Sequence, residues 1–230
     1  MDYLSRVEGW LNAVVPVVHL SSRVASDTRR PLFARCLGDG AEVQMSSFRT
    51  DGYELVPQLV SRELCEFIYK AMLMESNGSY SPDRQCPLSH GRYASPTSEA
   101  LLVWCHHTVQ ALTGLTLLPT YSYHRVYFAG DDLFLHTDRP SCEVSVTVHI
   151  GHHLIDNPWP IWMGDTAISM DIGDGVMYRG CDIPHRRDVL KCDVAGNHAQ
   201  VFLHYVDANG PNAEWAFDKR EGLGLKAVDK

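Results

Sequence analysis

Hydrophobic positions recur at helical spacing in two stretches of the first half of the chain. Ser61 is a typical N-cap residue, and the apolar residues that follow it at i, i+3, i+4 and i+7 predict a helix with one buried face. Ser95 and Pro96 supply an N-cap and a first-turn proline for a second helix, which ends at Gly114. The buried face of the first helix is expected to consist of Leu64, Phe67, Ile68, Ala71 and Met72.

From residue 115 onward the pattern changes to short apolar or alternating runs. Gly, Asp, Asn and Pro residues separate these runs at regular intervals, which is typical of a sandwich or jelly roll. We therefore expect an α+β chain that is mainly β, with the N-terminal helices packed on one side of a jelly roll and its other end open. The expected strands cover residues 115–118, 121–128, 133–135, 143–151, 161–163, 167–171, 176–179, 186–190 and 199–206.

These elements predict a single domain of 230 residues. Residues 1–114 would form an N-terminal extension with the supporting helices, 115–206 the jelly-roll core and 207–230 a C-terminal tail. A short helix is expected near residues 3–15, and a turn at 38–40. The Gly-, Pro- and Ser-rich stretch 76–96 is either a solvated loop or a substrate lid that offers Arg92 and Tyr93.

Composition and charge narrow the classes of partner. The net charge is −8 and the Lys and Arg residues are scattered, which is a poor match to a nucleic-acid polymer or a membrane surface. The seven cysteines include no C-x-x-C pair, as expected of reduced thiols in a cytoplasmic protein. The apolar run at 13–18 is short and broken by Pro16, and no basic leader precedes it, so neither a signal peptide nor a membrane span is expected. A small-molecule substrate fits best, and the sequence gives no indication of oligomeric state.

Candidate chemistry begins with His136 and Asp138, which are separated by one residue at the start of a predicted strand. Positions i and i+2 of a strand share a face, so an imidazole and a carboxylate would project side by side. Two His and one carboxylate form the facial triad of non-haem Fe(II) oxygenases. The second His must come from a later strand, and we favour His185, which opens a strand 47 residues after Asp138. The histidines considered for this position are His149, His152, His153, His185, His198 and His204.

Three stretches carry a family resemblance: YSYHRVYFAGDDLFLHTDRPSCEVSVTVHI, GDGVMYRGCDIPHRR and QVFLHYVDANGP. Together with the upstream FRTDGYELVPQLVSRELC, they resemble the Fe(II)/2-oxoglutarate-dependent oxygenase superfamily, in the style of its prolyl-4-hydroxylase-like branch, over roughly residues 48–212. The resemblance implies a double-stranded β-helix that holds Fe(II) through His136, Asp138 and His185. It also implies 2-oxoglutarate as cosubstrate and O2 as oxidant.

The family also needs a cation for the far carboxylate of 2-oxoglutarate, commonly an Arg or Lys about ten residues after the distal His. Ala195 stands at that position, so the chain departs from the pattern. Arg187 is the favoured substitute because it shares the inward face of its strand with His185 and has a planar fork for carboxylates. Lys191 is another possible cation, and a surface salt bridge with Asp188 is the alternative role for Arg187. The cofactor-binding candidates are Arg187, His198, Tyr123 and Thr147.

Arg125 and Arg139 could bind an anionic substrate or orient Asp138 or Glu143, and the orienting role is favoured for Arg139. The reaction implied by the resemblance hydroxylates an unactivated C–H bond while 2-oxoglutarate is decarboxylated to succinate, with desaturation or cyclisation left open. Two other classes stay open on the residues alone. One is a cupin-like metal-binding protein without catalysis, and the other is a jelly-roll isomerase or hydrolase that uses Zn or Mn.

Overall fold

The computed structural model describes residues 46–78 and 85–225. The helix predicted near residues 3–15 and the turn predicted at 38–40 lie outside these ranges, so the single-domain organisation of the whole chain stays a prediction. Among the described residues, no helix combines the length and the apolar character needed to cross a bilayer. The helices are α2 (Ser47–Thr50), α3 (Arg62–Gly78) and α4 (Pro96–Thr113), with 3-10 turns η2 (Pro140–Cys142) and η3 (Ala213–Lys219).

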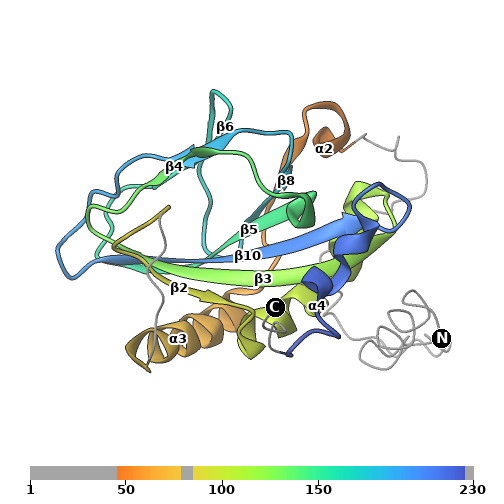
Figure 1. The fold of residues 1–230 in the computed structure, drawn as a ribbon. Coiled ribbons are helices and arrows are strands. Elements are labelled where there is room, and N and C mark those ends of the chain that lie inside the picture. The colour runs from red at the N-terminus through yellow and green to blue at the C-terminus, as the bar shows by residue number, and fades with distance from the viewer. Residues whose placement is uncertain (1–45, 79–84, 226–230) are drawn as a thin grey trace, which may run out of the picture. The chain divides into compact units, whose positions relative to one another are not determined.

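Two antiparallel sheets face each other (Figure 1). The larger sheet has the order β1-β8-β5-β10-β3-β2 and the smaller one β4-β9-β6-β7. This arrangement confirms the mainly β jelly roll that the spacing of turn residues predicted. The strands are β1 (Tyr53–Val56), β2 (His90–Tyr93), β3 (Leu117–Phe128), β4 (Leu133–His136), β5 (Val144–His153), β6 (Ile161–Met163), β7 (Thr166–Ile168), β8 (Gly175–Arg179), β9 (His185–Arg187) and β10 (Asn197–Asp207).

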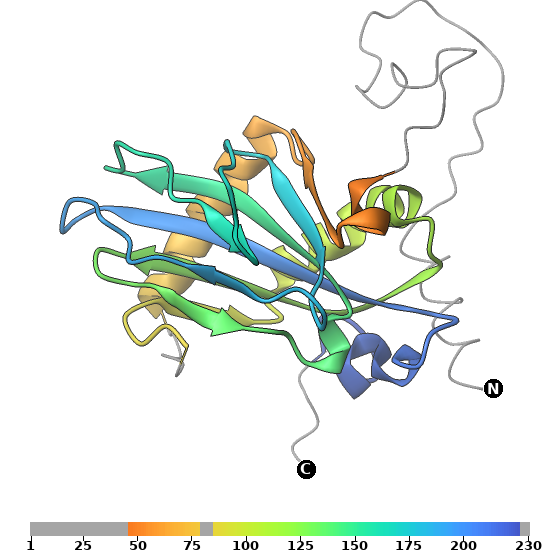
Figure 2. The same ribbon diagram turned by 90° about the horizontal axis from the view of Figure 1, so that it is seen from above.

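The two long helices cover the outer face of the larger sheet, and α3 crosses beneath its strands when the molecule is seen from above (Figure 2). Their boundaries follow from the predicted caps. The Ser61 hydroxyl accepts a hydrogen bond from the Leu64 amide at 3.3 Å, and the Ser95 hydroxyl accepts one from the Ser98 amide at 3.3 Å. Gly114 ends α4 in the left-handed conformation, with φ of 67°.

Three local predictions need correction. Phe67 is 67% exposed, because the buried face of α3 is rotated and runs through Cys65, Ile68 and Met72. Pro119 does not interrupt β3, since it pairs opposite Tyr205, next to a register irregularity where a missing amide hydrogen is tolerated. The stretch 76–96 is not only a loop, because its last part forms the edge strand β2 against β3.

The inner surfaces of the two sheets form the core and position the site. Tyr127, Trp159 and Phe202 belong to one apolar cluster between the sheets, and Ile161 and Tyr178 belong to another. The strands place inward-facing side chains at every second position. The fold therefore stacks functional groups in successive layers along the inside of the jelly roll.

Candidate metal centre and pocket

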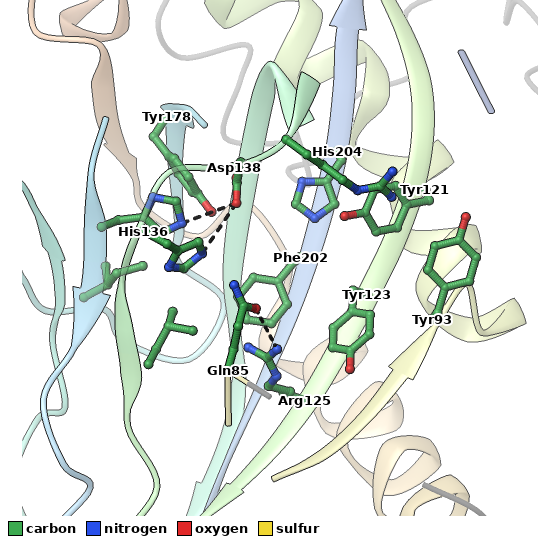
Figure 3. Close-up of a pocket in the computed structure, with 14 residues that line it drawn as sticks. Gln85, Tyr93, Tyr121, Tyr123, Arg125, His136, Asp138, Tyr178, Phe202 and His204 are labelled. Atoms are coloured by element: carbon green, nitrogen blue, oxygen red, sulfur yellow. Dashed lines mark hydrogen bonds and ion pairs between the residues drawn. The ribbon is translucent and has the colours of Figure 1, made fainter. Parts of the chain in front are cut away.

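The three predicted metal ligands, His136, Asp138 and His185, come together beside one pocket, and Figure 3 shows His136 next to Asp138. His136 ends β4 and pairs directly opposite His185, which begins β9. The Nε2 atoms of both rings lie 3.6 Å from the same oxygen, Oδ1 of Asp138. The ring centroids are 4.3 Å apart and the ring planes are tilted by 55°. One carboxylate oxygen and two imidazole nitrogens therefore face a common point.

The backbone differs in one respect from the sequence argument. The strand β4 ends at His136, so Asp138 does not share a strand face with it. Instead, Asp138 lies in the following turn, where its amide donates to the Gly180 carbonyl at 2.8 Å. A contact between two loops, which no periodic pattern reveals, brings the carboxylate to the imidazoles.

Backbone carbonyls orient both imidazoles. Nδ1 of His136 lies 2.8 Å from the Phe134 carbonyl, and Nδ1 of His185 lies 2.9 Å from the Ile183 carbonyl. An imidazole that donates through Nδ1 keeps the lone pair on Nε2, which is the arrangement usual for metal-ligating histidines. Both Nε2 atoms are therefore set up as ligands on the side that faces Asp138.

Asp138 is held as a carboxylate. Burial alone would raise its pKa, but the interactions with the imidazoles of His136 and His185 bring the pKa well below its ordinary value. The Ser145 hydroxyl donates to Oδ2 of Asp138 at 2.9 Å and also lies 2.9 Å from Nδ1 of His204. The second carboxylate oxygen is thus fixed, while the first faces the imidazoles.

A cavity of about 320 Å³ opens beside these three residues. Three alternating residues of β3, Tyr121, Tyr123 and Arg125, form its opposite wall (Figure 3). Arg125 is only 5% exposed, lies 5.2 Å from the centroid of the Tyr123 ring and donates through Nη2 to the Gln85 side chain at 3.2 Å. The pocket therefore offers a candidate metal centre and a buried guanidinium in one space.

The C-terminal segment holds two residues of the pocket lining, Arg139 and Tyr93, through Asp218. Arg139 donates to both carboxylate oxygens of Asp218, at 2.9 and 2.8 Å, and its guanidinium lies 4.6 Å from the centroid of the Tyr121 ring. The Tyr93 hydroxyl donates to the same carboxylate at 2.6 Å. Arg139 therefore pairs with Asp218, not with Asp138 or Glu143 as the sequence suggested.

The structure places Arg187 outside this pocket. Its side chain points inward and is fully buried, but Nη1 donates to the Trp159 carbonyl at 2.6 Å and the guanidinium lies 4.6 Å from the centroid of the Trp159 ring. Burial lowers its pKa to about 10. With the Gln200 amide turned so that its oxygen faces the donors, Nη2 donates to that oxygen at 2.7 Å. Arg187 is therefore not among the residues that line the pocket.

Three further predicted residues also lie away from the lining. Thr147 Oγ1 and the Gln200 amide are 2.9 Å apart, and Nε2 of His198 lies 2.9 Å from the same amide. Arg92 pairs with Glu75 on α3 at 3.3 Å. Of the predicted cofactor- and substrate-binding residues, those that line the pocket are Tyr93, Tyr123, Arg125 and Arg139.

Sequence reasoning missed several residues of the pocket. Tyr178 lies with its ring centroid 4.7 Å from that of His185, and His204 and Phe202 line the wall from β10. Alternation along β8 and β10 was the available signal for these three, because they occupy inward positions of predicted strands. Asp218 had no such signal, since it lies in an irregular turn with φ of 54°.

No protein-family model matches the sequence, and the search of curated proteins found no relative. Solved structures do resemble the fold. They include the α-ketoglutarate-dependent epimerase SnoN from nogalamycin biosynthesis (TM-score 0.60, 13% identity, 81% of this chain and 88% of that chain). HygX from Streptomyces hygroscopicus, with nickel and 2-oxoglutarate bound, gives a TM-score of 0.56 at 12% identity over 74% of this chain and 89% of that one. A Pseudomonas putida prolyl-4-hydroxylase gives 0.55 at 13% identity over 70% and 95%.

The fold and the site together define a jelly-roll protein with a His-Asp-His cluster at the edge of a pocket. More particularly, its fold is the one found in the 2-oxoglutarate-dependent oxygenases, as the resemblance of the sequence predicted. At 12–13% identity these similarities establish the fold only, and the chemistry has to be argued from the residues of this chain.

Proposed function

We propose that the protein is an Fe(II)- and 2-oxoglutarate-dependent dioxygenase that oxidises an unactivated C–H bond of a small molecule. The observation that carries this proposal is the convergence of two imidazole Nε2 atoms on one oxygen of Asp138, each at 3.6 Å. Two His and one carboxylate on one side of a metal leave positions on the other side open for cosubstrate and oxygen. The pocket lies on that open side.

The donor set fits Fe(II). His136 and His185 would each supply one imidazole nitrogen and Asp138 one negative charge, so a divalent ion held there would keep a net positive charge that attracts a carboxylate cosubstrate. When bound there, Fe(II) and 2-oxoglutarate would supply the chemistry that consumes dioxygen, releases succinate and carbon dioxide and oxidises the substrate. Tyr121, Tyr178 and Phe202 line this space with aromatic surface, which would limit the water around the reacting groups.

Arg125 is the residue best suited to hold the far carboxylate of 2-oxoglutarate. It is a nearly buried guanidinium in the wall of the pocket, and Tyr123 next to it can donate a second hydrogen bond. Arg187, which the sequence favoured, is separated from the pocket and is held by Trp159 and Gln200. We therefore assign the carboxylate to Arg125.

The mouth of the pocket suits a substrate with polar groups, since Arg139 and Tyr93 meet there around Asp218. HygX has been solved with hygromycin B bound and SnoN with nogalamycin RO bound, so these two proteins of similar fold bind small molecules. We take hydroxylation as the default outcome. SnoN is an epimerase and SnoK a carbocyclase, so the same fold serves other outcomes in those proteins.

Anaerobic reconstitution of chelator-treated protein with Fe(II) and 2-oxoglutarate tests the proposal. We expect a weak visible absorption band near green wavelengths and, on admission of oxygen, release of succinate. His136→Ala should lose both signals, and His107→Ala should keep both, because His107 is exposed on α4 away from the pocket. Metal binding without any effect of 2-oxoglutarate would favour a cupin-like protein. A band that survives His136→Ala would rule out this metal centre.

A further inference from the structure

A second cluster of histidines lies away from the candidate iron centre. His149, His152 and His198 each offer one ring nitrogen, and these three atoms lie within 4.8 Å of one another. His198 is near the start of β10, six positions before His204, which lines the first pocket. At about 3.3 Å per residue, the two positions are about 20 Å apart along the strand. The cluster opens into a different groove.

A β-bulge brings these histidines together. In a regular strand His149 and His152 would point to opposite faces, because they are three residues apart. In β5, Gly151 pairs with Ala199 and His149 pairs with Gln200, so Ile150 is an extra residue that shifts the register by one. His152 then pairs directly with His198. Bulges of this kind re-aim side chains and are over-represented next to functional sites.

Two of the three rings, His149 and His198, are held by oxygen atoms from outside the cluster, as at the candidate iron centre. Nδ1 of His149 lies 2.9 Å from the Met170 carbonyl, and its Nε2 lies 3.1 Å from Nδ1 of His152, a hydrogen bond that a bound metal would replace. Nε2 of His198 donates to the Gln200 amide oxygen at 2.9 Å. A histidine whose second nitrogen is bound to a carbonyl or amide oxygen has the arrangement typical of a metal ligand.

The groove around the cluster carries charges of both signs. Asp174 lies close enough to His149 to act on it electrostatically. Asp156 and Asp171 line the same groove and favour a cation. The guanidinium of Arg187 disfavours a cation in the cluster, because its positive charge also acts on His149.

We propose that His149, His152 and His198 form a second metal site, for a divalent ion of the zinc class with a fourth position open to the groove. Three imidazoles suit zinc, copper or nickel. The ring planes of His149 and His198 are only 22° apart, so binding has to turn the rings out of their stack before they can point at one ion. The exposed His152 is the ring most free to turn. A bound ion would join the bulged end of β5 to the start of β10.

Zinc stoichiometry of chelator-stripped full-length protein tests this site, measured by competition with a zinc-binding dye. We expect two equivalents for the wild type and one for His152→Ala. The double variant His136→Ala, Asp138→Ala should retain one equivalent, the one that depends on His152. His153→Ala is the matched control and should keep two, because His153 is exposed and adjacent in sequence but outside the cluster.

The outcomes separate the two sites. A wild type that binds one equivalent, or a second equivalent that survives both His152→Ala and the milder His198→Gln, would overturn the second site. Loss of an equivalent with His152→Ala but none with the double variant would support the second site and count against the candidate iron centre. Cobalt(II) substitution gives an independent reading, since tetrahedral coordination by three imidazoles should give visible bands that only the His152-containing proteins show.

Discussion

The two histidine clusters contain similar side chains but differ in how well the imidazole rings are oriented to bind a metal. At the candidate iron centre the ring planes of His136 and His185 are tilted by 55° and both rings face one carboxylate oxygen. At the second cluster His149 and His198 are stacked within 22°, and the cluster contains no carboxylate. In both, an oxygen of the protein holds the second nitrogen of the ring. Ring nitrogens that lie close together are therefore not sufficient for metal binding, because the metal has to lie in the plane of each imidazole ring.

This difference predicts an order of affinity. A site whose ligands already point at the metal loses little free energy on binding, whereas a stacked cluster first has to break its ring contacts. The carboxylate adds a negative charge at the candidate iron centre, and Arg187 places a positive charge near the second cluster. We expect the first equivalent of metal to enter the His136, Asp138 and His185 site.

The largest predicted effect concerns Arg125, the buried cation in the wall of the pocket beside the candidate iron centre. Arg125→Ala should raise the 2-oxoglutarate concentration needed for half-maximal succinate release by about 30-fold or more, because loss of one partner of a buried charge pair costs about 2–5 kcal/mol. Zinc stoichiometry should stay at two. Steady-state kinetics with varied 2-oxoglutarate measures the change.

Arg139→Ala is the matched control, since Arg139 is a pocket cation at the mouth. It should leave the requirement for 2-oxoglutarate close to that of the wild type. If Arg187→Lys raised that requirement while Arg125→Ala did not, the cosubstrate carboxylate would belong to Arg187, and the boundary drawn here between the two clusters would be wrong.

How far the sequence could predict these features depends on whether the signal is local. The caps at Ser61 and Ser95 and the turns between strands are local, and they predicted the long helices α3 and α4 and most strands correctly. The edge strand β2 escaped prediction because it exists only through its pairing with β3. Pairing across the sheet also decides the bulge at Ile150, so the cluster around His149 could not be inferred from residue spacing.

The candidate site divides in the same way. His136, Asp138 and His185 were predicted from residue type and order, and the structure brings them together. Arg187 points inward as predicted but is not among the residues that line the pocket, because a strand pattern gives the face of a residue and not its position along the inside of the jelly roll. Asp218 reaches the mouth through an irregular turn, whose conformation no propensity describes.

A substitution at Gly180 tests the candidate iron centre separately from the second cluster. A Cβ at this position would lie within 3 Å of Oδ2 of Asp138, of the Cys142 carbonyl and of the Ser145 hydroxyl. Gly180→Ala should therefore displace the carboxylate and weaken metal binding at this site by about 10- to 100-fold, as displaced supporting groups commonly do. The second cluster should bind zinc as before. Gly222→Ala is the control, because its added Cβ would meet only Leu225 at 3.8 Å.

Gly151 offers the corresponding test at the second cluster, with the smallest expected effect. An added Cβ would lie 3.0 Å from the ring of Tyr69 on α3, so the bulged part of β5 next to His152 has to shift by a few tenths of an ångström. Mild overpacking costs about 1 kcal/mol, which corresponds to about a fivefold change in an equilibrium constant. Gly151→Ala should thus weaken zinc binding at the second cluster about fivefold, measured by dye competition, and leave succinate release unchanged. Equal weakening of both sites would mean that the two clusters share one deformable unit and are not independent.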